Sequence, residues 1–326
     1  MALRPANHIS PSEGSVSLKG VSTTSKPIME PPKGTDSGPT PLDGTEPTPV
    51  ELTVGYKSII DFGRAPAVEF PHTIGEYPSK IFPQTAHAMI DRFSRPGDTI
   101  LDPFCGCGTF AVEAKRLGRN SINYDVNPVG LSLTKEKLGA LGGLDRFSGP
   151  PVTMHEVARV DARELPLPDE SVDAVITDIP YGNMIHYSSL PDDLSTIEDY
   201  EQFLVEVKRA FAEARRVLRP GKYCVMFVCD YRIGAARRIL PIHSDVTHFM
   251  TRELGFVLFD TYIWRYYRSG GFRPFGRRPF QAMNLHSYIL VFYKPDGTED
   301  MNRKNRDVRY RDRLVEKQRS VSKRLE

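Results

Sequence analysis

The chain has 326 residues, of which 40% are hydrophobic and 26% are charged, and its formal net charge is +2. This size allows one large α/β domain or two small ones, and the near-neutral charge excludes a uniformly basic nucleic-acid coat protein. No apolar run has membrane-spanning length and no signal-peptide pattern opens the chain, so we expect a cytoplasmic protein without a membrane partner, nucleoid-associated if prokaryotic.

Residues 1–49 are rich in Pro, Gly, Ser and Thr and nearly lack aromatic residues. Such a segment buries too little surface to offset its ordering entropy, so we predict a disordered tail. The four cysteines, Cys105, Cys107, Cys224 and Cys229, lack the paired spacing of a zinc site and are predicted to be free thiols in a reducing compartment. We expect no metal.

The segment 77–93 begins as an extended, Pro-containing piece and continues as a predicted helix from Gln84. Ala86, Met89, Ile90 and Phe93 share one face of that helix. A Gly-rich turn follows the predicted strand Thr99–Leu101, and a helix over 110–117 comes next. The second strand, Ser121–Tyr124, ends at Asp125, where an acidic residue can hold a ribose through its hydroxyls.

The rest of the main domain alternates in the same way. We predict helices over 129–138, 201–218 and 242–254, and strands over 157–161, 172–177, 223–229, 256–264 and 287–293. This alternation predicts a doubly wound α/β architecture with a mostly parallel, seven-stranded sheet. The all-apolar run Tyr223–Cys229 is typical of a strand in the middle of such a sheet.

The turn after the first strand, DPFCGCGT over 102–109, lacks the Gly-Lys-Ser/Thr ending of a P-loop. It resembles the first motif of the Rossmann-like class I S-adenosylmethionine (SAM)-dependent methyltransferases, in particular the DNA amino-methyltransferases. The upstream residues Lys80, Phe82 and Pro83 are similar to the segment that packs on the methionine end of SAM in that family. The resemblance implies SAM as cofactor, held by Lys80, Phe82, Pro83, Asp102, Pro103, Phe104, Gly106, Gly108, Thr109, Asp125, Asn127, Asp161, Ala162 and Asp178.

A second motif, Asp178-Ile179-Pro180-Tyr181, resembles the D/N/S-P-P-Y turn of the amino-methyltransferases. An exocyclic amine conjugated with its ring is a poor nucleophile, so acceptors for its protons raise its reactivity. The Asp178 carboxylate and the Ile179 carbonyl are predicted for that role, Pro180 stiffens the turn, and Tyr181 stacks on the base. Ile179 departs from the family, which usually has proline there.

Between the last two predicted strands, the loop over about 264–284 interleaves arginines with aromatic residues around glycines. This composition predicts contacts with phosphates or guanine edges. The candidate residues are Arg265, Arg268, Arg273, Arg277 and Arg278.

The tail over 295–326 is basic: from Met301 it holds about ten Lys and Arg against about four Asp and Glu. It is compatible with a helix along DNA, a dimer contact or a solvated extension. The catalytic domain that the resemblance implies therefore extends over 50–294.

The predicted function is site-specific methylation of adenine N6 or cytosine N4 in DNA, with a homodimer or a cognate restriction enzyme as a compatible partner. The alternatives are methylation of a guanine amine in tRNA or another RNA, since those enzymes also carry an Asp-Pro-Pro-Tyr-Gly turn, and a non-catalytic SAM-fold subunit that binds nucleic acid.

Overall fold

The computed structural model describes residues 58–61, 68–142, 153–233, 238–265 and 286–298, which all belong to the unit Pro47–Glu326. The predictions for the tails 1–49 and 299–326 and for residues 266–285 lie outside them. The strands are β1 (Ile59–Ile60), β2 (Thr99–Asp102), β3 (Asn120–Asp125), β4 (His155–Arg159), β5 (Val172–Asp178), β6 (Leu218–Val228), β7 (Tyr231–Ile233), β8 (Arg238–Leu240), β9 (Val257–Arg265) and β10 (His286–Tyr293).

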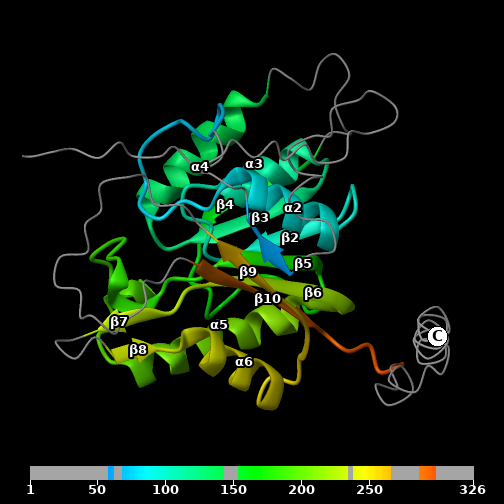
Figure 1. The fold of residues 1–326 in the computed structure, drawn as a ribbon. Helices are drawn as coiled ribbons and strands as arrows, with labels where there is room; N and C mark the ends of the chain where they lie inside the picture. The colour runs from blue at the N-terminus through cyan, green and yellow to red at the C-terminus, as the bar shows by residue number, and fades with distance from the viewer. Residues whose placement is uncertain (1–57, 62–67, 143–152, 234–237, 266–285, 299–326) are drawn as a thin grey trace, which may run out of the picture. The chain divides into compact units, whose positions relative to one another are not determined.

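Eight of these strands form one sheet in the order β1-β9-β10-β6-β5-β2-β3-β4 (Figure 1). The strands β6, β5, β2, β3 and β4 are parallel, whereas β10 is antiparallel to both β6 and β9. The predicted doubly wound, mostly parallel architecture is confirmed, and the two-residue strand β1 adds an eighth strand at the β9 edge. The strands β7 and β8 form a separate antiparallel pair that the sequence pattern did not reveal.

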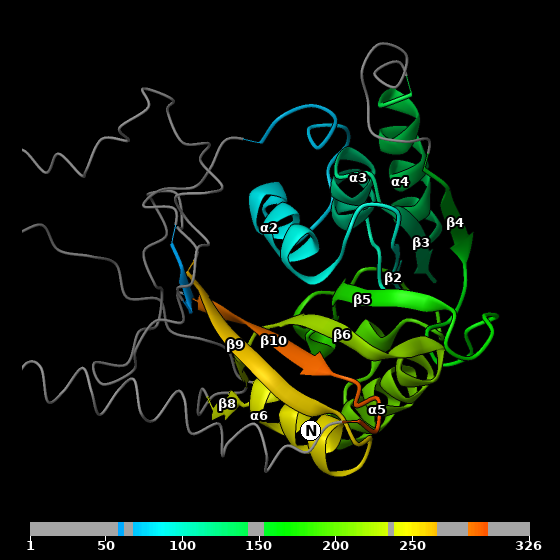
Figure 2. The same cartoon turned by 90° about the vertical axis from the view of Figure 1, so that its right-hand side faces the viewer.

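Helices cover both faces of the sheet, as Figure 2 shows. On one side are α2 (Pro83–Phe93), α3 (Thr109–Arg116) and α4 (Pro128–Ala140), and on the other are α5 (Tyr200–Val217) and α6 (Ile242–Arg252). Two apolar clusters fill the layers between helices and sheet: one joins Met89 and Ile90 to Ile176, and the other joins Phe203 and Phe211 to Met226. Parallel strands buried on both faces explain the near-continuous apolar runs.

The local sequence explains where the main helices begin. Asn127 caps α4, because its side chain accepts a hydrogen bond from the backbone of Val129 at 3.0 Å, and Pro128 occupies the first turn. The Asp199 carboxylate caps α5 in the same way, through the backbone N–H of Gln202 at 2.8 Å. Among the described residues, no helix is both long and apolar enough to cross a membrane.

Candidate active site

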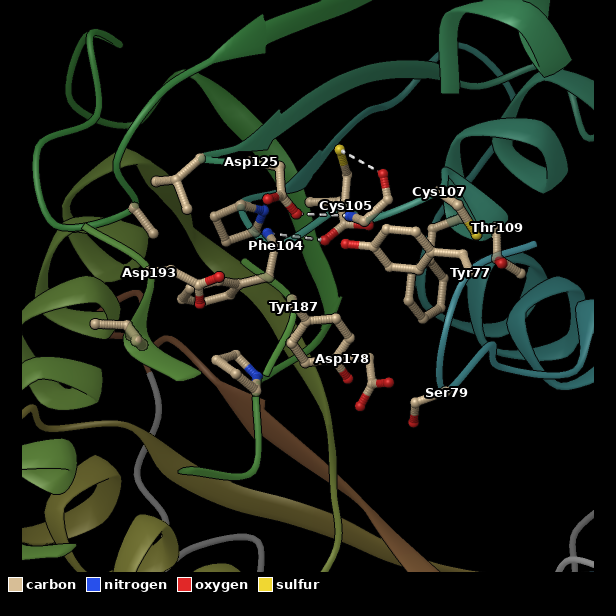
Figure 3. A pocket seen from close by; sticks show the side chains of 18 of the residues that line it. Tyr77, Ser79, Phe104, Cys105, Cys107, Thr109, Asp125, Asp178, Tyr187 and Asp193 are labelled. Carbon is tan, nitrogen blue, oxygen red and sulfur yellow. Dashed lines mark hydrogen bonds between the residues drawn. The ribbon is translucent and has the colours of Figure 1, made fainter. Parts of the chain in front are cut away.

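Four aspartates mark the carboxyl ends of neighbouring parallel strands. Asp102, Asp125 and Asp178 are the last residues of β2, β3 and β5. Asp161 lies two residues beyond β4, because that strand ends at Arg159 and not at Asp161 as predicted. All four line one hollow of about 810 Å³, including its solvent-open part (Figure 3). Ligands bind at this edge in open α/β sheets, so the hollow is the candidate site.

The turn between β2 and α3 needs glycine for two reasons. Gly106 and Gly108 have φ angles of 48° and 78°, in the left-handed region that favours glycine. The turn is also crowded: a Cβ atom on Gly130, in the first turn of α4, would lie 2.6 Å from the carbonyl oxygen of Gly106. The backbone therefore closes tightly around the hollow, and side chains at these positions would displace it.

Helix α4 holds this turn from behind. The Thr134 hydroxyl donates to the Gly106 carbonyl at 3.0 Å, and the Lys137 ammonium donates to the Cys107 carbonyl at 2.8 Å. Lys137 is fully buried, and this burial lowers its pKa. The carbonyls of Gly106 and Cys107 are thus tied to α4, which fixes the shape of the turn beside the hollow.

The carboxyl group of Asp102 is buried beneath the turn. Its Oδ1 accepts from the Thr177 hydroxyl at 2.7 Å and from the Phe104 backbone at 3.2 Å, whereas Oδ2 is buried with no hydrogen-bond partner among the described residues. Burial raises its pKa to about 7. A buried polar atom without a partner is costly, so this oxygen is a natural acceptor for a cationic or N–H-bearing ligand.

Asp125 connects the glycine turn to the residue that caps α4. Its carboxylate accepts from the backbone N–H of Gly106 at 2.7 Å and of Asn127 at 2.8 Å. Burial raises the pKa of Asp125 to about 6, although these hydrogen bonds act in the opposite direction. Each oxygen retains a second lone pair, so the carboxylate can still accept from the hydroxyls of a ribose.

Asp161, which also lines the hollow, is held by a neighbouring arginine. The guanidinium of Arg163 contacts both carboxylate oxygens, at 2.6 to 3.0 Å, and also reaches Glu206 at 2.7 Å. Although partial burial opposes it, hydrogen bonding by Arg163 lowers the pKa of Asp161 overall. Asp161 therefore stays ionised and oriented at the edge of the hollow.

The turn after β5 places Asp178 in the hollow and Tyr181 in the core. The Tyr181 hydroxyl donates to Oδ1 of Asp178, and burial raises the Asp178 pKa to about 8. Ile179 is buried, and its backbone N–H donates to the Phe227 carbonyl at 3.4 Å, a bond that proline could not make. Pro180 lines the hollow, but Ile179 and Tyr181 do not.

Segment 77–81 forms the opposite wall. The Lys80 ammonium donates to the Gly75 carbonyl at 2.5 Å, and Lys80 is among the residues that line the hollow. Phe82 and Pro83 do not line it: Phe82 packs edge-on against Trp264, with ring centroids 5.5 Å apart, and Pro83 is buried at the start of α2. These two residues support the wall rather than form it.

Of the remaining predicted residues, Gly108 and Asn127 shape the turn and cap α4 without lining the hollow. Pro103, Phe104, Thr109 and Ala162 do line it. Several lining residues were not predicted from the sequence, because no motif marks them. They lie on segment 77–81 and on the segment between β5 and α5: Tyr77, Ser79, Tyr187, Asp192, Asp193 and Leu194. Proximity to the two motifs was the only signal that pointed to them.

Arg265 is the one predicted nucleic-acid contact that the described residues include. It ends β9, is 51% exposed and donates to Asp61 at 2.9 Å. Arg268, Arg273, Arg277 and Arg278 lie outside the described residues.

Together these residues fit SAM. The hollow offers carboxylates for a cation, and an acidic acceptor at or just beyond the end of each of two neighbouring strands. Neither the glycine turn nor the acidic lining suits a pyrophosphate, which needs donors rather than acceptors.

Comparison with known families places this site in context. A model described as "DNA methylase", of the N6/N4 type, matches residues 56–136 and 172–325, and one described as "Methyltransferase domain" matches residues 101–226. Both therefore include the glycine turn and the turn at Asp178.

Three relatives illustrate the range of similar proteins. The tRNA (guanine(10)-N2)-dimethyltransferase of Methanothermobacter thermautotrophicus is 39% identical over 32% of this chain and 29% of its own length. The U6 snRNA (guanine-N(2))-methyltransferase THUMPD2 of Bos taurus is 31% identical over 49% of this chain and 28% of its own. The type II methyltransferase M.MjaII of Methanocaldococcus jannaschii is 37% identical over 21% and 13%. The chain thus spans less than a third of each relative.

Proposed function

Because this chain belongs to the N6/N4 DNA methylase family, we propose that it methylates the exocyclic amine of adenine or cytosine in DNA. At the coarser level it is a SAM-dependent N-methyltransferase of nucleic acid with the Rossmann-like methyltransferase fold, and SAM is its cofactor. The observation that supports the proposal most directly is Asp178, whose carboxyl group faces the hollow from the end of β5.

SAM supplies a methyl group already activated by the positive sulfonium. The protein must then hold the amine in line with that methyl group and accept the proton that nitrogen loses. Oδ1 of Asp178 is taken by the Tyr181 hydroxyl, which leaves Oδ2 for the amine. With a pKa near 8, this carboxyl group is matched to taking up and releasing a proton close to neutral pH.

The test uses SAM with a deuterated methyl group, mixed with the enzyme and unmodified genomic DNA, followed by mass spectrometry of the nucleosides. We expect labelled N6-methyladenine or N4-methylcytosine from the wild type. Asp178→Ala, which removes the side-chain acceptor for the amine, should lose at least about 100-fold in rate. Unlabelled DNA would refute the proposal.

A second candidate is methylation of guanine N2 in RNA. Two observations favour it: Gly182 follows Tyr181 with a φ of 59°, and the longer alignments are to guanine-N2 RNA methyltransferases. Running the same assay with total RNA separates the two, because label would then appear as N2-methylguanine.

A further inference from the structure

The turn at Asp178 raises the question of which aromatic ring meets the target base. Tyr181 is only 6% exposed and packs in the core cluster on the α5 side of the sheet, and its hydroxyl donates a hydrogen bond to Asp178. Its ring does not line the hollow. To stack on a base, Tyr181 would have to leave the core and abandon that hydrogen bond.

Tyr187, six residues later, is placed differently. It is half-buried and lines the hollow, and Figure 3 shows its ring beside Asp178. Burial, with the nearby charge of Asp178, raises the pKa of Tyr187, so its phenol stays neutral. The side chain therefore offers an uncharged aromatic surface next to the carboxyl group that awaits the amine.

The Tyr187 ring is held from the cofactor side. It stacks on Tyr77, with ring centroids 5.9 Å apart and planes inclined by 22°. Tyr77 in turn lies against the glycine turn, since a Cβ atom on Gly106 would come within 3.1 Å of its ring. The two tyrosines thus form a continuous aromatic wall from the glycine turn to Asp178.

The backbone around Tyr187 is fixed as well. Its carbonyl accepts from the Asn127 side chain at 3.0 Å, and its N–H donates to the Ser195 hydroxyl at 3.2 Å. On the facing segment, Ser79 interacts with the Tyr187 phenol and has a φ of 54°. A non-glycine residue in that region is strained, and such strain concentrates at functional sites.

We propose that Tyr187, and not Tyr181, provides the aromatic face on which the target base lies during methyl transfer, while Tyr181 acts only by orienting Asp178. The inference rests on the proposed function, because it takes a nucleobase as the substrate. A flipped base needs both an edge contact and a stacking surface, and Asp178 and Tyr187 supply these two side by side.

The test measures stacking without requiring catalysis. The probe is a single-stranded oligonucleotide with 2-aminopurine between thymines, whose fluorescence is quenched when the base stacks on an aromatic ring. It is saturated with enzyme in the presence of S-adenosylhomocysteine. Bound wild type and Tyr187→Phe should quench the probe equally, whereas bound Tyr187→Leu, which fills the space without an aromatic face, should leave it brighter.

Two controls separate this role from a general defect. Tyr181→Leu, which removes the aromatic ring of Tyr181, should quench like the wild type, and so should Phe259→Ala, which removes an aromatic side chain that is 56% exposed in the first half of β9. Calorimetry should give a SAM affinity within about threefold of the wild type for Phe259→Ala, and saturating S-adenosylhomocysteine keeps the cofactor site filled in the other variants. Equal emission from bound wild type and Tyr187→Leu, or loss of quenching only in Tyr181→Leu, would overturn the inference.

Catalysis then provides an independent measurement. On whichever nucleic acid accepts methyl groups, Tyr187→Leu should lower kcat/KM by about tenfold, which is ~1.4 kcal/mol and lies within the range of one base–aromatic stack. Tyr187→Phe should stay near the wild type. If the wild type methylates neither DNA nor RNA, the proposed function fails, while the fluorescence comparison still decides whether Tyr187 stacks on a base.

Discussion

The buried carboxyl group of Asp178 is expected to lower the free energy of unfolding of the protein. Asp178→Asn, which removes the ionisable group, tests this expectation directly. Burial raises the Asp178 pKa from 3.8 to about 8. Below pH 3.8 the carboxyl group is protonated in both states and has no effect. As the pH rises from 4 to 8, the unfolded chain ionises this group while the folded protein does not, so the folded state loses stability through that window.

The size of the effect follows from the pKa change. At 1.36 kcal/mol per pKa unit, an upper bound of about 5 kcal/mol is reached at pH 8. The hollow is open to solvent, so we expect a measured gain of about 1–3 kcal/mol for Asp178→Asn. The asparagine oxygen still accepts from the Tyr181 hydroxyl, so the variant leaves no buried donor without a partner.

Urea unfolding of the ligand-free protein at pH 5.5, 7 and 8 measures this. The stability difference between Asp178→Asn and the wild type should grow with pH. Glu164→Gln is the control, because that side chain is exposed and does not line the hollow. A variant that is less stable than the wild type, or a difference that stays flat with pH, would refute the desolvation argument.

Three further predictions concern the rest of the site. Gly130→Ala should destabilise the protein by about 1–3 kcal/mol and weaken SAM binding, because the added Cβ atom meets the Gly106 carbonyl. Gly139→Ala in the same helix is the control: its Cβ atom would have nothing within 4 Å, so it should be neutral or slightly stabilising. Equal urea unfolding midpoints for the two variants would contradict this. SAM affinity, measured by calorimetry, should rise between pH 6 and 8, because the cation favours the ionised forms of Asp102, Asp125 and Asp178, whose pKa values are raised to about 7, 6 and 8. The neutral product S-adenosylhomocysteine should show a smaller rise, and an equal rise would count against the carboxylates. Replacing Arg273, Arg277 and Arg278 with alanine should weaken DNA binding and flatten its salt dependence, as measured by filter binding at several salt concentrations. SAM affinity should not change. An unchanged salt slope would argue against phosphate contacts in that loop.

The amino-acid sequence determined the strand-and-helix order and the chemical type of the site. Apolar runs and helical periodicity depend only on neighbours in the chain, so α2, α5 and β5 were predicted within about two residues of their observed bounds. The aspartates at strand ends followed from the same logic, because parallel strands bring their carboxyl ends to one edge. The glycine turn and the turn at Asp178 then identified the cofactor.

Tertiary structure decided which residues actually face the ligand. Tyr181 belongs to a recognisable motif, yet the packing of β5 against α5 buries its ring, and only its hydroxyl reaches the site. Tyr187 belongs to no motif, yet the path of the segment between β5 and α5 brings it onto Tyr77, which is 110 positions away in the chain. The local sequence pattern cannot reveal such contacts, because they depend on how segment 77–81 packs against the segment between β5 and α5. The raised pKa values have the same origin, since they come from the depth at which the folded chain buries each carboxyl group, and the sequence contains no measure of that depth.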